Sequence, residues 1–207
     1  MSVPGTRATP EQIRETLPAD RGRLARSLAD AFLDDPVACW AAPYERLRWS
    51  CLRKFFGAYL TIRLSMGLVW NDSDHAGVAI WSPPGKGVTT PVEALRLISA
   101  YAHPRLWPRG PLVGYGLRSV EHLHPKSPDH LYLATLGVKP SEQGRGLGSL
   151  LLGPALELCD RDGLPAYLEA SKESNIAFYA RHGFRVKRDI KLPLGPTMYA
   201  MWREPQR

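Results

Sequence analysis

Apolar residues recur with two different periods along the chain, and the two periods predict helices and strands in mixed order. Helical spacing predicts helices over residues 18–33, 43–65, 92–102, 112–123, 146–162 and 175–182. Short apolar runs predict strands over residues 11–16, 68–71, 77–81, 131–138, 166–170, 184–192 and 197–203. A turn at Asp72-Ser73-Asp74 joins the second and third strands as a hairpin. We therefore expect a single α/β domain with a central mixed β-sheet flanked by helices.

The expected helix over residues 146–162 contains a proline. Pro154 has no backbone N–H for the helical ladder, and an interior proline costs about 3 kcal/mol. We therefore predict a kink near residues 150–153 or a widened first turn.

Length and composition place the chain among ordinary globular proteins. Its 207 residues, 44% of them hydrophobic, can bury a sizeable core. Residues 1–9 are expected to form a disordered tail and residues 10–207 a single domain. No stretch approaches the roughly 20 apolar residues that span a bilayer, and no basic and apolar leader begins the chain. Cys39, Cys51 and Cys159 form no C-x-x-C pair, so reduced thiols in a cytoplasmic protein, away from membranes, are expected.

The chain is basic, with a formal net charge of +7 and an isoelectric point near 9.5. The arginines are scattered over several expected helices rather than gathered on one. No groove-entering helix or run of base-stacking aromatic residues accompanies the charge, so nucleic-acid binding is not expected. Attraction for a polyanionic cofactor is a sufficient explanation of the charge.

The most informative segment is a β-rich run that leads into a glycine-dense turn at the start of a helix. Without a Cβ, Gly144, Gly146 and Gly148 let the backbone come close to a ligand. The first N–H groups of a helix lack intrahelical partners and carry partial positive charge, so they suit a pyrophosphate. Arg145 adds a positive charge within the loop. The segment therefore predicts a phosphate cradle.

Spacing separates three kinds of phosphate loop. The nucleoside-triphosphate loop G-x-x-x-x-G-K-[ST] fails at Gly85-Lys86 in two positions. Ile80 stands where the motif needs its first glycine, and Gly87 stands where it needs a serine or threonine. The dinucleotide pattern G-x-G-x-x-G is missed by one residue, and Glu169 stands about twenty residues on, where a ribose-binding acid is expected. The third pattern, [Q/R]-x-x-G-x-[G/A], is that of acyl-CoA-binding acetyltransferases. It fits from Gln143 onward.

A second motif, E-A-S-K-E-S-N-I-A-F-Y-A-R-H-G-F, follows at residues 169–184. Together the two motifs resemble the GNAT superfamily of acyl-CoA-dependent N-acetyltransferases, most closely the puromycin N-acetyltransferase type. That likeness extends to L-A-T-L-G-V before the loop, A-F-x-x-D-P at residues 31–36 and Leu194-Gly195-Pro196. It covers residues 130–203 well and the preceding half in patches. It implies a GNAT-like mixed sheet whose cofactor half spans residues 130–203.

The resemblance implies an enzyme that moves an acetyl group from acetyl-CoA directly to the primary amine of a small molecule. Tyr179 is then the general acid that protonates the leaving thiolate, because a tyrosine hydroxyl keeps its proton at neutral pH. Asn175 serves either as a helix N-cap or as a partner of the pantetheine arm. By the same analogy, a local splay of the sheet frees a backbone amide for the thioester carbonyl. The cofactor-binding residues are then Leu136, Gly137, Val138, Gln143, Gly144, Arg145, Gly146, Leu147, Gly148, Ser149, Asn175 and Tyr179.

The general base is less strongly indicated. Glu169 is the leading candidate, at the end of the strand that faces the expected cofactor cleft. The alternatives lie in the segment before the central strand and are Glu121, His122, His124 and His130. A histidine there could accept the amine's proton directly or through water. His122-x-His124 has no third ligand at characteristic spacing, so no metal site is expected.

Two other functions stay open: a nicotinamide-binding oxidoreductase, and a non-catalytic acyl-CoA-binding regulator that would not need Tyr179. Tryptophans that could form the floor of a pocket for an aromatic or amphipathic amine are Trp40, Trp49, Trp81 and Trp107. An antibiotic or a metabolite would fit that acceptor class. A homodimer is left open.

Overall fold

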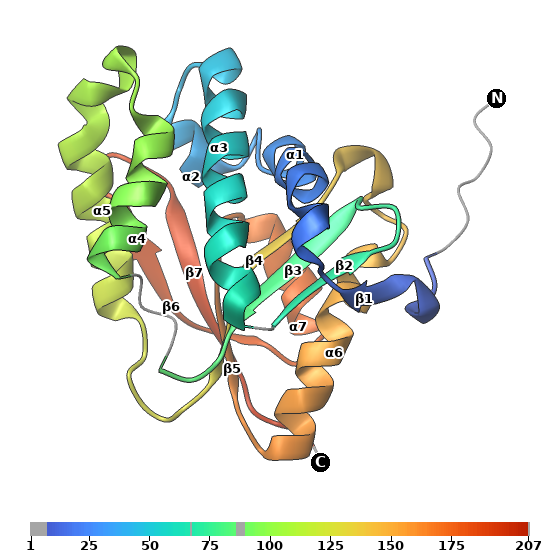
Figure 1. The fold of residues 1–207 in the computed structure, drawn as a ribbon. Helices are drawn as coiled ribbons and strands as arrows, with labels where there is room; N and C mark the ends of the chain where they lie inside the picture. Colours follow the sequence, from blue (N-terminus) through green and yellow to red (C-terminus); the bar gives the residue numbers. More distant parts are fainter. Residues whose placement is uncertain (1–7, 67, 86–89, 207) are drawn as a thin grey trace.

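The computed structural model describes residues 8–66, 68–85 and 90–206, and these form a seven-stranded mixed sheet (Figure 1). The strand order is β1-β2-β3-β4-β5-β7-β6, in which β4 and β5 are parallel and all other neighbours are antiparallel. The strands are β1 (Ile13–Glu15), β2 (Val69–Asp72), β3 (Gly77–Ser82), β4 (Leu131–Val138), β5 (Ala166–Ala170), β6 (Arg185–Lys191) and β7 (Thr197–Arg203). The expected single mixed α/β domain is confirmed.

Helices connect the strands. The α-helices are α1 (Arg21–Ala31), α2 (Pro36–Ala41), α3 (Glu45–Arg63), α4 (Pro91–Ile98), α5 (Gly110–Leu123), α6 (Leu147–Asp162) and α7 (Ile176–Ala180). Short 3₁₀ helices are η1 (Pro10–Gln12), η2 (Pro18–Asp20), η3 (Leu64–Met66), η4 (Ser99–Tyr101), η5 (Pro104–Arg109), η6 (Pro140–Glu142) and η7 (Glu173–Asn175). None of the described helices is long and apolar enough to cross a membrane.

Most expected elements are present, and α2 is the main one that the sequence analysis missed. From the sequence pattern, Asp34-Asp35-Pro36 predicts only the end of the helix expected over residues 18–33. In the structure Asp35 also begins the next helix, because its Oδ1 accepts hydrogen bonds from the backbone N–H groups of Val37 and Ala38. Pro36 follows at the first helical position, where no N–H is needed.

Two other expectations concern local order. The expected tail over residues 1–9 lies outside the described residues except for Ala8 and Thr9. Of these, Ala8 donates a backbone hydrogen bond to Arg145. Helix α6 runs without interruption through Pro154, and the kink predicted there stays a prediction.

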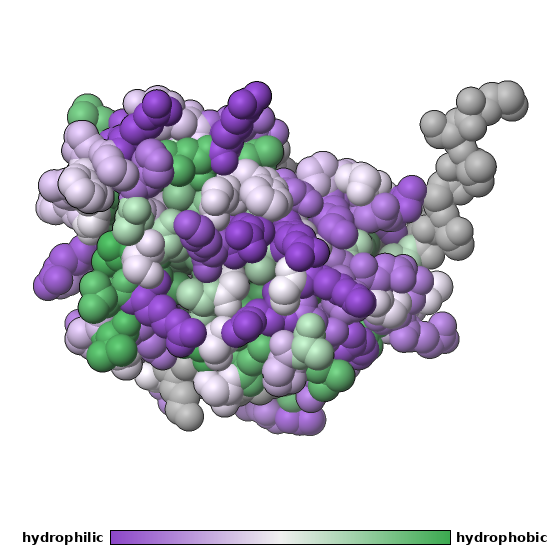
Figure 2. Space-filling model, turned by 45° about the horizontal axis from the view of Figure 1, so that its top comes forward, coloured by the Kyte–Doolittle hydropathy of each residue, from purple (hydrophilic) through white to green (hydrophobic). Residues whose placement is uncertain are grey.

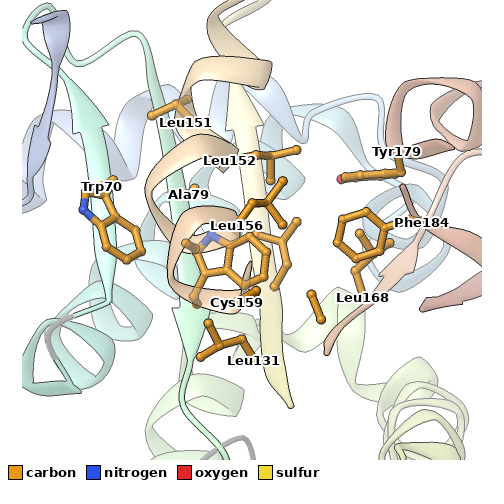
Figure 3. Close-up of a cluster of buried hydrophobic side chains, with 14 of the residues drawn as sticks. Trp70, Ala79, Leu131, Leu151, Leu152, Leu156, Cys159, Leu168, Tyr179 and Phe184 are labelled. Atoms are coloured by element: carbon orange, nitrogen blue, oxygen red, sulfur yellow. The ribbon is translucent and has the colours of Figure 1, made fainter. Parts of the chain in front are cut away.

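The two faces of the sheet are covered by different helices (Figure 1). Helices α1 and α3 pack on one face of β3 and β4, whereas α6 packs on the other face of β2–β4. Alternate residues of β3 point to opposite faces, so Val78 and Ile80 join the α1–α3 core while Ala79 and Trp81 join the α6 core. Figure 3 shows the α6 core, which extends to Tyr179 and Phe184. This places α6 and α7 on one side of the sheet.

A buried ion cluster fastens β1 and the start of α1 to the β2–β3 turn. The Asp20 carboxylate binds the Arg14 guanidinium at 2.7 and 3.0 Å and the His75 ring at 2.7 Å. It also accepts the backbone N–H of Leu17 at 2.9 Å. Hydrogen bonding from Arg14, His75 and Leu17 holds the pKa of Asp20 far below its ordinary value of 3.8.

We expect Asp20→Asn to lower the free energy of unfolding by about 2 kcal/mol at neutral pH, because the change leaves Arg14 unpaired. A carboxyl whose folded pKa is depressed stabilises the protein above its unfolded pKa, and that stability is lost as the pH falls. The difference between the two proteins should therefore shrink below pH 3.8. Urea unfolding at several pH values measures it, with the exposed Asp74→Asn as the control. An unchanged difference at acid pH would contradict this account.

Candidate active site

The glycine-dense turn lies between β4 and α6, in a backbone conformation that favours glycine. Gly144 and Gly146 have positive φ values of 78° and 87°, and Gly146 is the N-cap of α6. A Cβ added at either residue would meet no atom within 4 Å, so both glycines face open space. Gly148 differs, because its Cβ would lie 3.3 Å from the Phe178 ring. Two glycines therefore shape the turn, and the third makes room for α7.

The backbone amides of this turn are available to a ligand. The N–H groups of residues 144–148 donate no hydrogen bond to the described part of the chain. The first amide that does so is that of Ser149, which bonds to Gly146 at 3.0 Å. Consecutive free donors at the positive end of a 16-residue helix form a site for a phosphate or pyrophosphate group.

Side chains around the turn hold its shape. The Gln143 amide donates to the Val138 carbonyl at 2.9 Å and so closes the loop onto the end of β4. The Arg145 guanidinium lies 2.5 Å from the Glu142 carboxylate, so this ion pair holds the charge of Arg145 within the loop. Leu147 is buried in the α6 core. The side chains of Gln143 and Leu147 thus hold the loop in place, and the groups available to a ligand are the backbone N–H groups.

Strands β4 and β5 splay apart toward the C-terminal end of β4. They pair only from Leu131↔Ala166 to Leu133↔Leu168, although β4 continues to Val138. Opposite β3, the register shifts between Leu133 and Thr135, so Ala134 is an extra residue that bends β4. The splay expected from the family resemblance is therefore present. It leaves Leu136, Gly137 and Val138 unpaired on the β5 side.

The residues beyond the last β4–β5 pair differ in the face to which they point. Leu136 and Val138 pack against the α6 core. Gly137 points to the other face, where an added Cβ would lie 2.5 Å from Leu28 and 2.9 Å from Phe32 of the α1 segment. The glycine therefore lets α1 lie directly on the end of β4.

Tyr179 of α7 belongs to the α6 core, on the side of the sheet that α6 covers. Its side chain is buried, and Figure 3 shows its hydroxyl directed toward Leu152. The hydroxyl makes no hydrogen bond within the described residues. Burial, and then the nearby charge of Asp35, raises the pKa of Tyr179 above its ordinary value of 10. The phenol therefore keeps its proton across the physiological range.

Glu169 occupies the first position of β5 after the last β4–β5 pair. Because Leu168 joins the α6 core, Glu169 points to the opposite face, the face of Tyr167. Its side chain is only 4% exposed, and its Oε1 lies 3.6 Å from Nδ1 of His124. The alternative of a ribose-binding acid does not fit, because α6 and its glycine turn lie on the other face. Glu169 and Tyr179 therefore lie on opposite faces of the sheet, with Glu169 at the strand opening.

The other base candidates divide into two pairs. His124 and His130 stand together beside Glu169, with their Nε2 atoms 3.2 Å apart. Glu121 and His122 are exposed on α5 and are not part of this group. No group of three or more metal-binding side chains occurs among the described residues.

Two further residues that the resemblance assigns to cofactor binding are Asn175 and Ser149. Asn175 ends η7 with helical backbone angles, and its side chain makes no capping hydrogen bond in the described structure, so the N-cap role is not supported. The Ser149 hydroxyl bonds to Nε2 of His182 at 3.0 Å. That bond ties the first turn of α6 to the segment after α7.

The four tryptophans do not gather into one pocket. Trp81 is fully buried in the α6 core, and Trp40 is enclosed near Gly116 and Gly195. The Trp49 ring bonds to Asp30 at 2.7 Å. Trp107 is 68% exposed on η5, and Figure 2 shows hydrophobic surface on the side where Figure 1 places α4 and α5. The four tryptophans therefore form no common pocket floor, because distance along the chain says little about which residues meet across the sheet.

The structure adds Asp35 and Ser171 to the site. The Ser171 hydroxyl, one residue after β5, donates to Oδ2 of the buried Asp35 carboxylate. This bond fastens the start of α2 to the end of β5. Asp-Pro at residues 35–36 was the available signal, because an aspartate before a proline is a common helix start.

Comparison with known proteins identifies the family. A family model described as the acetyltransferase (GNAT) family matches residues 81–184, half of the chain. The chain belongs to this acetyltransferase family. It is 28% identical over 190 residues to an uncharacterized N-acetyltransferase of Schizosaccharomyces pombe, covering 84% of this chain and 74% of that protein.

Solved structures agree with the family. This acetyltransferase is similar to a crystal structure described as histone acetyltransferase HPA2 and related acetyltransferase from Corynebacterium glutamicum. The TM-score is 0.67 at 26% identity, over 95% of this chain and 97% of that one. The PaiA N-acetyltransferase of Thermoplasma acidophilum, solved with coenzyme A, shares the fold with a TM-score of 0.57 at 14% identity, over 93% and 97%.

Proposed function

We propose that this N-acetyltransferase moves the acetyl group of acetyl-CoA directly to the primary amine of a small molecule. The observation that carries the proposal is the row of free amides at residues 144–148 beside the opening between β4 and β5. The pyrophosphate of acetyl-CoA fits the amides, and its pantetheine arm fits the unpaired edge at residues 136–138. Coenzyme A in the PaiA structure supports the donor class.

Each reacting group then has a residue of this chain beside it. Glu169 accepts a proton from the acceptor ammonium, whose ordinary pKa of about 10.4 keeps it charged at neutral pH. The free backbone of β4 stabilises the oxyanion that forms when the amine attacks the thioester carbonyl. Tyr179 donates its proton to the departing thiolate and regains one from the nitrogen, which loses its second proton as the tetrahedral intermediate collapses to the amide. Asn175 is proposed as a polar partner of the pantetheine arm.

The acceptor approaches from the face of Glu169, opposite the cradle. That face holds a carboxylate among aromatic rings, which suits a cationic amine. The puromycin type of the family is one candidate acceptor class, and an arylalkylamine and agmatine are named for two neighbours of the same fold. The cytoplasmic location and a homodimer stay predictions.

The test is a calorimetric titration with acetyl-CoA, CoA and NADPH, followed in the same samples by thiol release with a panel of amines. The panel contains puromycin, tyramine, agmatine and a peptide with a free α-amino group. Binding of CoA with thiol release on one small amine supports the proposal. Release on the peptide alone contradicts the acceptor class, and NADPH binding alone contradicts the donor. Binding of CoA without release on any amine favours a regulator.

We expect Gly146→Ala to weaken acetyl-CoA binding by about tenfold, because the new Cβ enters the open space before the free amides. The residue also has a φ of 87°, which strains any side chain by about 1 kcal/mol. Calorimetry measures the affinity. The matched control is Gly153→Ala in the interior of α6, where an added Cβ likewise meets nothing within 4 Å. Equal affinities for the two variants would exclude the cradle.

A further inference from the structure

A group of ionisable and aromatic side chains surrounds Glu169 on the acceptor face. His124 and His130 precede β4, Tyr132 lies on β4, and Tyr167 lies on β5. The His124 ring packs edge-on against both tyrosines, with centroids 4.7 and 4.9 Å away. The Glu169 side chain is 4% exposed, whereas that of His124 is 21% exposed. His124 is therefore the partly exposed histidine beside the buried carboxylate.

The hydrogen bonds define which ring nitrogens carry hydrogen. Nδ1 of His130 lies 2.8 Å from the Pro128 carbonyl, and a carbonyl can only accept, so that nitrogen donates. Burial, together with the neighbouring His124, lowers the pKa of His130, which favours the neutral ring. Its Nε2 is then an acceptor. The hydrogen between the two rings must come from Nε2 of His124, 3.2 Å away.

This assignment leaves Nδ1 of a neutral His124 with a lone pair that faces Oε1 of Glu169 at 3.6 Å. Two acceptors facing each other repel unless a proton lies between them. At 3.6 Å the two atoms are beyond hydrogen-bond range, so a proton passes between them when the side chains approach each other or through one bridging water, with the carboxylate on the buried side and the ring on the more exposed side.

We propose that His124 carries the acceptor's proton from Glu169 to solvent, and that His130 positions His124 for this transfer. This inference rests on the proposed function, because it needs an ammonium that must lose a proton. It concerns the route by which the acceptor's proton leaves Glu169, which the proposed function leaves open.

The ammonium R–NH₃⁺ gives one proton to the Glu169 carboxylate and becomes R–NH₂. Glu169 passes that proton to Nδ1 of His124, so the carboxylate is restored and the ring becomes an imidazolium. His124 then releases the proton to water, and the group returns to its starting state.

Other titratable groups near the pair do not provide this route. Burial, and then the charge of Glu169, raises the pKa of the Tyr132 and Tyr167 hydroxyls, so both keep their protons. The nearby side chains of α3 are Tyr59, whose pKa is also raised by burial, and the buried Arg63. Asp129 and Arg188 act on His130 and Tyr167 respectively through their charges. His124 is the member of the group that combines a lone pair toward Glu169 with access to solvent.

The first test reads the rings directly, without a substrate. Proton–nitrogen correlation spectra of the histidine rings at neutral pH should show hydrogen on Nδ1 of His130 and on Nε2 of His124. Glu169→Gln should change the His124 signals, because its amide N–H donates to Nδ1. The exposed His122 provides the reference ring. Hydrogen on Nδ1 and not Nε2 of a neutral His124 would overturn the assignment.

The second test is kinetic. In His124→Gln the amide can still donate to His130, but the side chain no longer has a group that accepts and releases a proton. We expect kcat to fall by about tenfold or more with little change in KM, and added imidazole buffer to restore part of it. His122→Gln is the matched control, and thermal unfolding checks the fold of both variants.

The outcomes separate the relay from the function. Wild-type thiol release together with an unchanged kcat in His124→Gln overturns the relay and leaves the transferase standing. A fall that imidazole does not restore, with a lowered melting temperature, indicates a packing role and also overturns it. If no panel amine releases thiol from the wild type, the proposed function fails, and the ring spectra still decide the proton positions.

Discussion

Replacing Tyr179 by phenylalanine is expected to lower kcat by about 10²-fold or more, while the Kd for acetyl-CoA changes by less than about twofold. The hydroxyl has no hydrogen bond within the described residues, so its loss leaves the buried ring and its contacts in place. What disappears is the proton for the departing thiolate. Burial and the charge of Asp35 raise the pKa of Tyr179, so the wild-type hydroxyl is protonated at neutral pH.

Stopped-flow thiol release and calorimetry on the same preparation measure the two quantities. Tyr115→Phe provides the control, because Tyr115 is 68% exposed on α5, whereas Tyr179 is buried. An unchanged kcat in Tyr179→Phe would remove the residue from the mechanism. A large loss of acetyl-CoA affinity with unchanged kcat would make it a binding residue instead.

The second large effect is expected from Glu169→Gln. The amide has nearly the same shape but cannot accept the ammonium proton, so kcat should fall by about 10²-fold or more. The fall should be smaller for an acceptor that is already neutral at the assay pH, because such an amine needs no base. Initial rates with amines of different basicity measure this dependence.

Two controls make this result interpretable. Glu157→Gln changes an exposed carboxylate on α6 and should leave the rates unchanged. Urea unfolding of Glu169→Gln shows whether the buried group has also altered stability. Equal activity of wild type and Glu169→Gln with a strongly basic amine would transfer the base role to another group or to a water chain.

The cofactor half of the fold could be predicted from local sequence. Strands β4 and β5 have the expected bounds, the glycine-dense turn lies between β4 and α6 as expected, and α6 begins one residue after the expected start. Each of these features depends on residues close together in the chain. The backbone geometry of the cradle is a local property, so a local pattern suffices to predict it.

The acceptor face could not be predicted in the same way. Glu169 meets His124 only because β5 lies beside β4 and alternates its side chains across the sheet. Nothing in the spacing of Trp40 and Trp81 shows that one is held beside the β6–β7 turn and the other lies under α6. Arg145 has the expected position but an unexpected partner in Glu142. Long-range pairing and the choice of face decide these contacts.

The most direct measurement is mass spectrometry of all products after incubation with acetyl-CoA that carries an isotope-labelled acetyl group. Direct transfer predicts labelled acetyl on the amine, free CoA in equal amount, and an unmodified protein chain. The label should be lost from the amine in Tyr179→Phe and Glu169→Gln over the same time. A labelled protein with an unlabelled amine, or CoA released by water alone, would contradict direct transfer to an amine.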